Sequence, residues 1–495
     1  MISFLISILV LVAGYLVYGK IVERVFAPDE RPTPAISKAD GVDYTPLPPW
    51  KIFMIQFLNI AGTGPIFGAI MGAKFGPAAY LWIVFGCIFA GAVHDYLAGM
   101  ISLRSGGTGL PETIGKYLGG TTRTVMLVFS VFLLVMVGAV FVFSPAKILS
   151  GIWEPAFFAE RFGDYTFWIA VVFIYYIVAT LLPVDKIIGR IYPIFAISII
   201  FMAIALFAVL LAKSPDLPEI WEGLSGVEGG PLTSTPIFPA LFISIACGAI
   251  SGFHATQSPM MARCMKSERQ GRPIFFGAMI TEGVVALIWA AIGSYFFYAK
   301  GGAGWSLIPG GAEALGDAPS IVNIICRDWL GVLGGILALI GVVAAPITSG
   351  DTAMRSCRLI IADFLHLEQK SILKRLYISI PLFGATFALL LWEMNDSAGF
   401  EKLWGWFGWS NQTLSVFTLW AITVYLAHRK KPYIISLVPA LFMTCVCSAF
   451  LLVSPGAFAL PYPVAGAITA AILAIAIAWF YRWKRRDDTL ARSLQ

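Results

Sequence analysis

Residues 59–68 read Asn-Ile-Ala-Gly-Thr-Gly-Pro-Ile-Phe-Gly, in the middle of an apolar run that extends from 51 to 73. Two glycines and a proline within four residues make a continuous helix unfavourable by propensity, and Pro65 also removes one backbone hydrogen bond. We therefore expect the helix to unwind at 61–64. A second half-helix would then begin with Pro65 at its first position, where the missing N–H does no harm.

A second interrupted stretch, residues 247–259, reads Cys-Gly-Ala-Ile-Ser-Gly-Phe-His-Ala-Thr-Gln-Ser-Pro. Here we expect Ser258 to cap a half-helix that begins at Pro259, which leaves His254 in the unwound segment. The two breaks lie five helices apart, and because five is odd, the two halves of the chain run in opposite senses. Paired breaks in inverted halves indicate a secondary transporter with its site at the membrane midplane. The alternative is that Gly and Pro only kink tightly packed helices.

The composition of the chain agrees with membrane burial of both breaks. Of 495 residues, 58% are hydrophobic and only 13% are charged, against about 25% charged residues in soluble domains. The mean hydropathy is +0.82. These values exclude soluble or disordered domains and predict an all-α polytopic membrane protein. Segments of about 20 mostly apolar residues, long enough to cross a bilayer, occur thirteen times, roughly at 3–19, 51–73, 79–103, 123–144, 166–182, 190–212, 237–262, 272–298, 330–360, 375–391, 403–427, 432–452 and 460–481.

Charge and cysteine usage exclude several other classes. The net charge of +6 is small and spread along the chain, so we expect no nucleic-acid partner. The seven cysteines lie in or beside apolar runs without metal-ligand spacing. We interpret them as reduced packing residues and expect neither a metal nor another cofactor. No nucleophile–base cluster and no His-Glu-x-x-His motif indicates an enzyme.

The basic residues predict the orientation of the thirteen spans. If all thirteen cross the membrane, 27 of the 34 Lys and Arg residues fall on the side of the C-terminus and 7 on the other side. Cytoplasmic loops carry the excess of Lys and Arg, so we expect the C-terminus in the cytoplasm and the N-terminus outside. The tail at 481–486, Tyr-Arg-Trp-Lys-Arg-Arg, is typical of an anchor at the lipid surface, with a regulatory lipid site as the alternative.

Four blocks of sequence resemble the carbon starvation protein family, the bacterial peptide and pyruvate transporters. Besides 59–68, they are Gly91-Ala-Val-His-Asp-Tyr96 with 102–106; 247–254 with Glu282 downstream; and Thr348-Ser-Gly-Asp-Thr352 with Arg355 and 407–412. The resemblance covers most of 50–420. The stretch 256–265 departs from the pattern of the larger members, and the C-terminal region is shorter.

The resemblance implies a fold, a substrate class and a location. The family looks like part of the amino acid–polyamine–organocation superfamily, with a five-plus-five inverted repeat as in LeuT. The division would be 1–50 (extra helix and loop), 51–213 (first repeat), 236–428 (second repeat) and 429–495 (two helices and basic tail). We expect a symporter of the bacterial inner membrane that imports pyruvate or a similar small carboxylate. Peptide or amino-acid transport is the alternative, and a sensor or channel is a more remote one. The sequence does not indicate the oligomeric state.

The expected substrate contacts lie at the breaks. Half-helices beginning at Pro65 and Pro259 would offer free N–H groups to an anionic or zwitterionic substrate. Asn411 and Gln412 follow an aromatic cluster near the outer end of the eleventh span; they could close an outer gate or reach the substrate, whereas such aromatics are usually interfacial anchors. The candidate substrate-binding residues are Asn59, Gly62, Thr63, Gly64, Ser251, His254, Gln257, Ser258, Asn411 and Gln412.

Ionisable residues inside spans are candidates for proton coupling. His254 ranks first because a histidine's ordinary pKa of about 6.5 lies near working pH. Asp95 with the adjacent His94, then Glu282, then Asp351 follow. Neighbouring positions on a helix point about 100° apart, so His94 and Asp95 are expected not to face each other. For each of these residues a purely structural hydrogen bond is the alternative.

Thr348 and Ser349 provide a rival coupling site. In sodium-coupled relatives of the superfamily, a Ser/Thr pair on this helix binds the ion together with carbonyls of the first broken helix. Here those carbonyls would belong to Ala61 and Gly62, and oxygen ligands suit such a hard cation. Asp351 and Arg355, spaced i, i+4, could instead form an ion pair. The sequence leaves proton and sodium coupling open, with the proton favoured.

Overall fold

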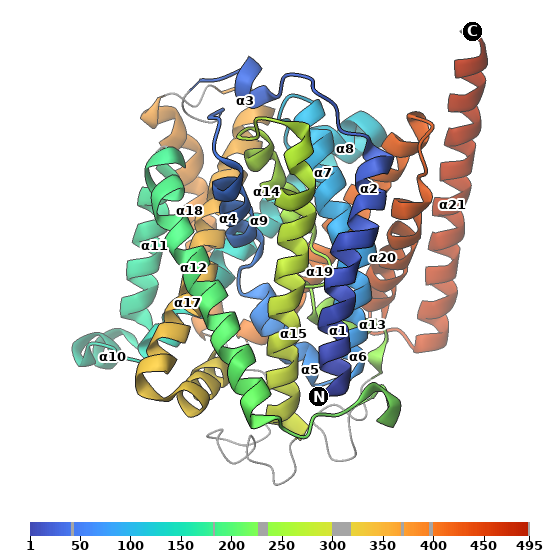
Figure 1. Cartoon of the computed structure of the whole chain (residues 1–495). Helices are drawn as coiled ribbons and strands as arrows, with labels where there is room; N and C mark the ends of the chain where they lie inside the picture. The colour runs from blue at the N-terminus through green and yellow to red at the C-terminus, as the bar shows by residue number, and fades with distance from the viewer. Residues whose placement is uncertain are drawn as a thin grey trace.

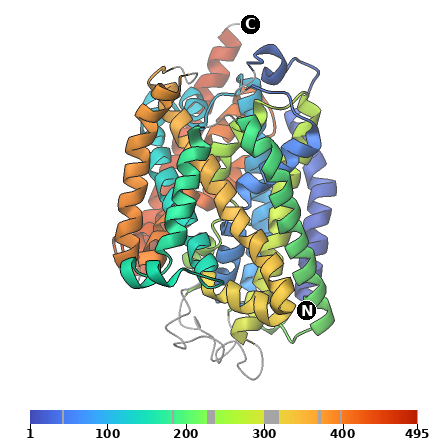
Figure 2. The same ribbon diagram turned by 90° about the vertical axis from the view of Figure 1, so that its left-hand side faces the viewer.

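The protein is a bundle of helices that run between two ends (Figures 1 and 2). The computed structural model describes residues 1–40, 44–181, 184–225, 236–298, 318–367, 371–395 and 399–493, and this part of the chain contains no β-strand. The expected loop residues 226–235 and 300–317 lie outside the described residues. The N-terminus lies at the lower end of the bundle in Figure 1 and the C-terminus at the upper end.

The helices alternate in direction along the chain, and the long ones cross the bundle once each (Figure 1). In chain order the main elements are α1 (Ile2–Ala13), η1 (Gly14–Tyr18), α2 (Gly19–Phe26), α3 (Pro34–Ser37), α4 (Pro49–Ile60), η2 (Gly64–Gly68), α5 (Ala69–Ala73), α6 (Ala78–Leu81), η3 (Trp82–Gly91), α7 (Ala92–Arg104), α8 (Leu110–Leu118), α9 (Gly120–Ser150), α10 (Ala156–Phe162), α11 (Thr166–Leu181), α12 (Val184–Lys213), α13 (Ile237–Ser244), α14 (Gly252–Ala262), η5 (Glu268–Gln270), η6 (Arg272–Phe276), α15 (Gly277–Tyr298), α17 (Ala318–Phe364), α18 (Ile372–Asn395), α19 (Gly399–His428), α20 (Ile434–Val453) and α21 (Tyr462–Ser493).

The membrane character of the fold follows from helix length and composition. Eight helical segments of the described chain are long and apolar enough to cross a membrane, and two bent pairs raise the number to ten. The remaining three expected positions hold α13 with α14, α17 and α19, which carry polar residues of the candidate site. The chain is therefore an all-α polytopic membrane protein, and the number thirteen stays a prediction.

The first predicted break is confirmed. Helix α4 ends at Ile60, the chain leaves helical geometry at Ala61 (φ −80°, ψ 54°), and the helical path resumes at Gly64 with Pro65 in its first turn. The two halves meet at an angle of 53°. Proline fixes φ near the helical value and lacks the N–H that a first turn leaves unused, so the sequence sets both the place of the break and the restart.

The second break exists, but the predicted restart at Pro259 is wrong. Helix α14 begins at Gly252, after Ser251 in extended geometry (φ −146°, ψ 122°), and Pro259 lies inside the helix. Ser258 therefore caps nothing, and His254 lies in the first turn of α14. Proline is tolerated within a buried membrane helix because neighbouring groups can satisfy the freed carbonyl. Helix α14 therefore continues through Pro259 despite the local signal, and the missing N–H leaves the Ala255 carbonyl without its usual intrahelical donor.

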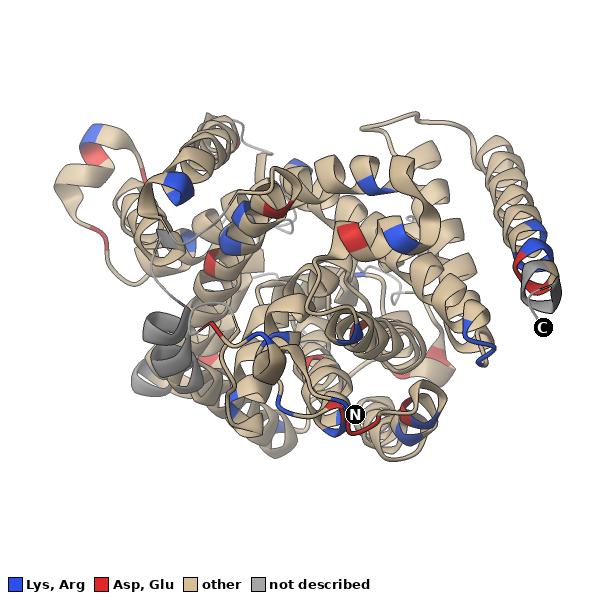
Figure 3. Ribbon diagram, turned by 90° about the horizontal axis from the view of Figure 1, so that it is seen from above, with Lys and Arg blue, Asp and Glu red and all other residues tan. Residues whose placement is uncertain are grey.

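The basic and acidic residues form no single patch on the end of the bundle that carries the C-terminus. Figure 3 looks down on this end and shows Lys and Arg spread over many helix ends and loops. Helix α21 stands at the edge of the bundle (Figure 1), and only 17% of its apolar window is buried. Its exposed apolar side chains agree with the expected contact with lipid.

At the opposite end, Glu219 fixes the start of α1. Its carboxylate accepts hydrogen bonds from the backbone N–H of Ile2 (2.8 Å) and Ser3 (2.7 Å) and also pairs with the amine of Met1. Burial alone would raise the pKa of Glu219, but these bonds outweigh it and lower the pKa to about 2. A carboxylate at a helix N-terminus satisfies otherwise unpaired N–H groups and opposes the positive end of the dipole.

We expect Glu219→Gln to lower the free energy of unfolding by about 1 kcal/mol, the usual size of a lost cap. Thermal unfolding of the purified protein, followed by tryptophan fluorescence, measures the change. The depressed pKa means that the carboxylate contributes above about pH 4.5 and loses its effect as the pH falls toward about 2. The gap between variant and wild type should therefore narrow in acid. Glu160→Gln on exposed α10 is the control, and an equal effect of both changes would contradict the role of Glu219.

Candidate functional site

The two breaks lie against each other in the interior. A Cβ atom added to Gly64 would lie 2.2 Å from the Cβ of Cys247, and one added to Gly248 would lie 2.5 Å from the Cβ of Ala286. Gly248 also has φ +86°, which favours glycine. Gly64 thus allows the two unwound segments to approach closely, and Gly248 allows the second one to pack against α15.

The unwound segment at 245–251 is held mainly by Asn411 of α19. Its Oδ1 accepts hydrogen bonds from Ser251 Oγ (3.0 Å) and the N–H of Phe253 (2.7 Å), and its Nδ2 donates to the carbonyl of Ala246 (2.8 Å). All of these groups are buried. One side chain thus satisfies two backbone groups, the Phe253 N–H and the Ala246 carbonyl, and also the Ser251 hydroxyl.

Two more side chains form hydrogen bonds with the backbone at or next to this segment. Gln412 Nε2 donates to the carbonyl of Phe242 (3.0 Å), and Glu282 Oε1 accepts from the N–H of Gly248 (3.1 Å). Asn411 and Gln412 therefore support the break, a role that the sequence did not indicate. Gln412 Oε1 has no hydrogen-bond donor among the described residues, so this atom remains available to a substrate.

A row of ionisable side chains lies beside the second break. Asp95 Oδ2 is 2.8 Å from His254 Nδ1, and His254 Nε2 is 3.5 Å from Glu282 Oε2. The three residues come from α7, α14 and α15 and are fully buried. A doubly protonated imidazole can donate to both carboxylates, whereas a neutral one can donate to only one. We call Asp95, His254 and Glu282 the charged row.

His94 joins the charged row at its Asp95 end. His94 Nδ1 lies 2.8 Å from Asp95 Oδ1, so the expectation that these neighbours do not meet is wrong. The Asp95 carboxylate and the Nδ1 atom of His94 both lie close to the backbone. They can therefore meet even though adjacent helix positions point about 100° apart. His94 Nε2 has no partner among the described residues.

Cys247 is a neighbour of the charged row that sequence spacing did not reveal. The thiol, His254 and Glu282 each offer a ligand atom, and these atoms lie within 4.8 Å of one another. A cation would find its ligands here. His254 also contacts Asp95, and Glu282 also accepts the Gly248 N–H.

The remaining candidates on α14 face its own backbone or α17. Ser258 Oγ donates to the carbonyl of His254 (3.0 Å), and Gln257 Oε1 accepts from Ser356 Oγ of α17 (3.3 Å). Neither side chain lies in unwound backbone, because α14 starts earlier than expected. Gln257 thus links the second broken helix to the helix that carries Thr348 and Ser349.

The predicted cation site is formed only in part. Ser349 Oγ donates to the carbonyl of Leu58 (2.7 Å) and lies 3.1 Å from the position of a Cβ on Gly62. Thr348 Oγ1 donates to carbonyls of its own helix. Ser349 therefore reaches the end of α4 just before Ala61.

Asp351 and Arg355, in the same helix, form the ion pair that was the alternative to a cation site. The two side chains lie 4.0 Å apart, and the guanidinium also donates to the carbonyl of Ala179 (2.5 Å). Both side chains are buried. Because a cation already accompanies Asp351, it keeps its last rank among the proton-coupling candidates.

Polar side chains of the first break have no partners. The amides of Gln56 and Asn59 and the hydroxyl of Thr63 are fully buried, and none makes a hydrogen bond among the described residues. Buried polar groups are normally satisfied, so these atoms are candidates for contact with a substrate. Gln56 was not predicted, although its position one turn before Asn59 could have indicated it.

The aromatic cluster before Asn411 divides between two faces of α19. Trp404 and Phe407 are buried, with Trp404 against Phe67 of η2 (ring centroids 5.9 Å) and Phe407 against Phe141 (6.1 Å). The anchor interpretation is wrong for these two rings, because positions three apart face the core together with Asn411. They cover the first half-helix instead.

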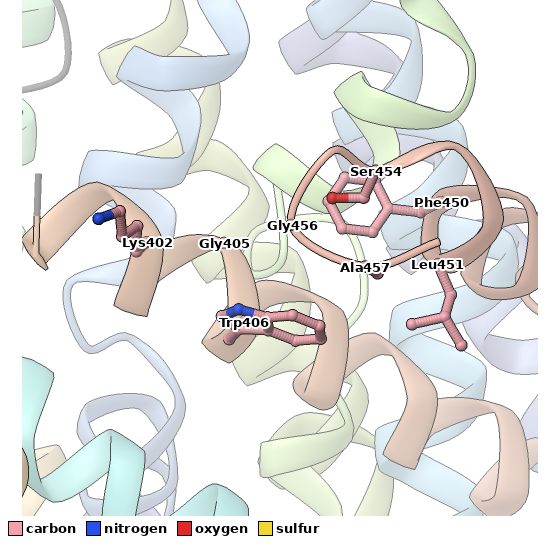
Figure 4. A pocket seen from close by; sticks show the side chains of 8 residues that line it. All are labelled: Lys402, Gly405, Trp406, Phe450, Leu451, Ser454, Gly456 and Ala457. Carbon is pink, nitrogen blue, oxygen red and sulfur yellow. The ribbon is translucent and has the colours of Figure 1, made fainter. Parts of the chain in front are cut away.

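Trp406 lies on the other face, where it lines a pocket of about 380 Å³ with Lys402 and residues at the end of α20. Figure 4 shows its indole extending toward Leu451 and Ala457, with Phe450 and Ser454 above them. Trp406 is 38% exposed, as expected of an interfacial aromatic residue.

Comparison with known proteins identifies the family of this chain. The model of the family described as carbon starvation protein CstA matches residues 1–158, 146–300 and 309–450. The chain belongs to this family. A peptide transporter CstA of Campylobacter jejuni is 27% identical over 88% of the chain and 78% of that protein. The pyruvate/proton symporter BtsT of Escherichia coli is 29% identical over 64% of the chain and 52% of that protein.

Two further proteins are similar to the chain, one in sequence and one in fold. An uncharacterized membrane protein of Haemophilus influenzae is 45% identical over 60% of the chain and 91% of that protein. The manganese transporter of Eremococcus coleocola has a similar fold, with a TM-score of 0.55 over 91% of the chain and 98% of that structure, at 12% identity. The family and its named relatives are transporters rather than enzymes, and their names confirm the predicted association with carbon starvation, peptides and pyruvate.

We expect Asn411→Asp to destabilise the protein and reduce transport. The carboxylate keeps one acceptor for Ser251 and Phe253 but loses the donor to Ala246, and its second oxygen faces that carbonyl. Leaving such buried groups unsatisfied costs about 1–3 kcal/mol. Thermal unfolding measures the loss, and Asn395→Asp at the exposed end of α18 is the matched control. Equal stability of the two variants would show that Asn411 does not hold the break.

Proposed function

We propose that the protein is a proton-coupled symporter that imports pyruvate or a similar small carboxylate. The observation that carries this proposal is the charged row, in which Asp95, His254 and Glu282 of three different helices meet at the second break. Buried ionisable groups inside a membrane are costly and mark pathways for ions or protons. The name of the relative BtsT, a pyruvate/proton symporter, supports the same function.

The half-helices supply the anion side of the proposal. Helix α14 starts at Gly252 and the first break restarts at Gly64, and each start presents N–H groups and the positive end of a helix dipole. A carboxylate bound between the breaks would contact both. Asn59, Gly62, Thr63, Gly64 and Ser251 line these segments. His254 and the amide oxygen of Gln412 complete the proposed substrate contacts, whereas Gln257 and Ser258 support α14.

Peptides or amino acids are the second candidate substrates, and Gln56 and Asn59 favour them. Each amide has both an unused donor and an unused acceptor among the described residues. Pyruvate offers acceptors only, whereas a peptide offers N–H groups as well. The relatives named peptide transporter CstA support this alternative. In either case the substrate is small and anionic or zwitterionic.

Sodium coupling at Ser349 is the rival to proton coupling. The Ser349 hydroxyl and the carbonyls near the end of α4 are oxygen ligands suited to a hard cation. Thr348 points to its own helix, so fewer protein ligands converge than we expected. The proton proposal requires no further ligand, since the charged row is already assembled.

The five-plus-five inverted repeat, the thirteen spans and the orientation form the architectural part of the proposal. We place repeats at 51–213 and 236–428, the additional helices at 1–50 and 429–495, and the protein in the bacterial inner membrane. The N-terminus lies outside and the C-terminus in the cytoplasm. The distribution of Lys and Arg supports this orientation.

Uptake into proteoliposomes tests the function. We expect labelled pyruvate to accumulate when an inward proton gradient is imposed, and a sodium gradient alone to have no effect. Labelled dipeptides are the parallel substrates. Accumulation of dipeptides but not of pyruvate would show that peptides are the substrate instead. Accumulation driven by sodium at constant pH would reject proton coupling and favour a sodium site at Ser349.

His254→Gln separates coupling from binding. Glutamine keeps hydrogen-bonding capacity but cannot take up a proton, so we expect gradient-driven accumulation to be lost while exchange of internal for external substrate falls only severalfold. Exchange needs reorientation of the site but no net proton movement. If accumulation and its pH dependence survive in His254→Gln, the titrating role passes to Asp95, which Asp95→Asn tests in the same assay.

Cysteine labelling tests the orientation. Glu222→Cys and Lys266→Cys place thiols at exposed positions on opposite ends of the bundle, and the native cysteines are buried apart from the half-buried Cys445. In intact cells an impermeant maleimide should modify position 222 but not position 266. The unmodified native protein is the background control, and the reverse pattern would invert the orientation.

A further inference from the structure

A small void lies between the charged row and the end of the bundle that carries the C-terminus, enclosed by α7, α8, α14 and α19. Its volume is about 10 Å³, at the lower limit of what one water molecule occupies. We call it the α7–α14 void. The residues that matter for its chemistry are Ala98, Ser102, Thr113, Ala255, Pro259 and Thr418.

One end of the α7–α14 void is close to the charged row along both helices. Ala98 and Ser102 follow Asp95 by three and seven residues, so the three positions share one face of α7. Ala255 follows His254 directly, and Pro259 lies one turn further along α14. With a rise of about 1.5 Å per residue, Ala98 is roughly 4.5 Å further along the axis of α7 than Asp95, toward the end that carries the C-terminus.

Hydrogen bonds of Thr108 link the far end of the void to a larger pocket at the end of the bundle that carries the C-terminus. Ser102 Oγ donates to the carbonyl of Thr108 (2.7 Å), and Thr113 Oγ1 lies 3.5 Å from Thr108 Oγ1. Thr108 also lines a pocket of about 530 Å³, together with Glu112, Arg123, Arg263, Asp363 and His366. We call this the cytoplasmic pocket, following the proposed orientation.

The void offers polar partners to a water molecule although its walls are otherwise apolar. The hydroxyls of Ser102, Thr113 and Thr418 donate to backbone carbonyls, and each retains an oxygen lone pair that can accept. Pro259 has no N–H to give to the carbonyl of Ala255, which leaves another acceptor. A buried water needs two to four such partners.

We propose that protons leave the charged row for the cytoplasm through the α7–α14 void. A water held there accepts a proton from the charged row and releases one to water of the cytoplasmic pocket, where Glu112 and Asp363 can receive it; no other bond changes. The void is far too small for pyruvate or a peptide, so in this state it suits a proton alone. This inference rests on the proposed proton coupling. The groups that face Asp95 are His94 of its own helix and His254 of α14, with Glu282 of α15 beyond His254.

Two equally conservative substitutions on α7 test the path. Ile101 lines the void and Leu103 does not, although both are buried. Ile101→Ala widens the void and should raise the proton leak without substrate severalfold, whereas Leu103→Ala should leave it at the wild-type rate. The leak is measured with a pH indicator trapped inside proteoliposomes under an imposed pH gradient. Equal potassium concentrations on both sides keep the potassium diffusion potential at zero. Equal leaks in the two variants would overturn the path.

Narrowing the void gives an independent result. Ala98→Val should reduce proton-driven accumulation severalfold while substrate exchange continues, because the substrate does not pass this way. Accumulation equal to that of the wild type would overturn the path even if Ile101→Ala leaks. Failure of the proposed function looks different: the wild type would then accumulate substrate on sodium alone, or not at all, whatever the leak of Ile101→Ala.

Discussion

The constraint on which the structure depends is that backbone unwound inside a membrane must find hydrogen-bond partners within the protein. At the second break, Asn411 supplies three hydrogen bonds, and Gln412 and Glu282 supply others. Without them, several buried N–H and carbonyl groups would be unsatisfied, each at a cost of a few kcal/mol. The position of α19 against α13 and α14 is thus a condition for the break.

The same constraint connects the break to the charged row. Glu282 accepts the Gly248 N–H with one oxygen and faces His254 with the other. A proton that arrives on this carboxylate changes what it can accept, and therefore changes how firmly the unwound segment is held. Conversely, a substrate that moves the segment shifts Glu282 relative to His254. In the symport that we propose, this shared side chain would couple proton and substrate, because each event would alter the hydrogen bonds available to the other.

The closed state of the interior also follows from packing. Trp404 packs against Phe67 of η2, and Phe407 contacts Phe141, which in turn contacts Phe253 beside His254. On the other side, the α7–α14 void leaves room for a single water molecule. The charged row is consequently separated from both surfaces by tightly packed layers, as a transporter needs between its two open states.

The sequence by itself determined the class of the protein, the existence of both breaks and the geometry of the first. Apolar length and low charge identify membrane helices from local composition, and Gly62, Gly64 and Pro65 act on the backbone they belong to, so no distant contact is needed. What only the tertiary structure decided is the restart at Gly252, the bond between His94 and Asp95, and the meeting of Asp95, His254, Glu282 and Cys247. These depend on side chains from helices far apart in sequence. Pro259, which looks like a boundary, lies inside α14, and hydropathy carries no information about which polar residues will face one another.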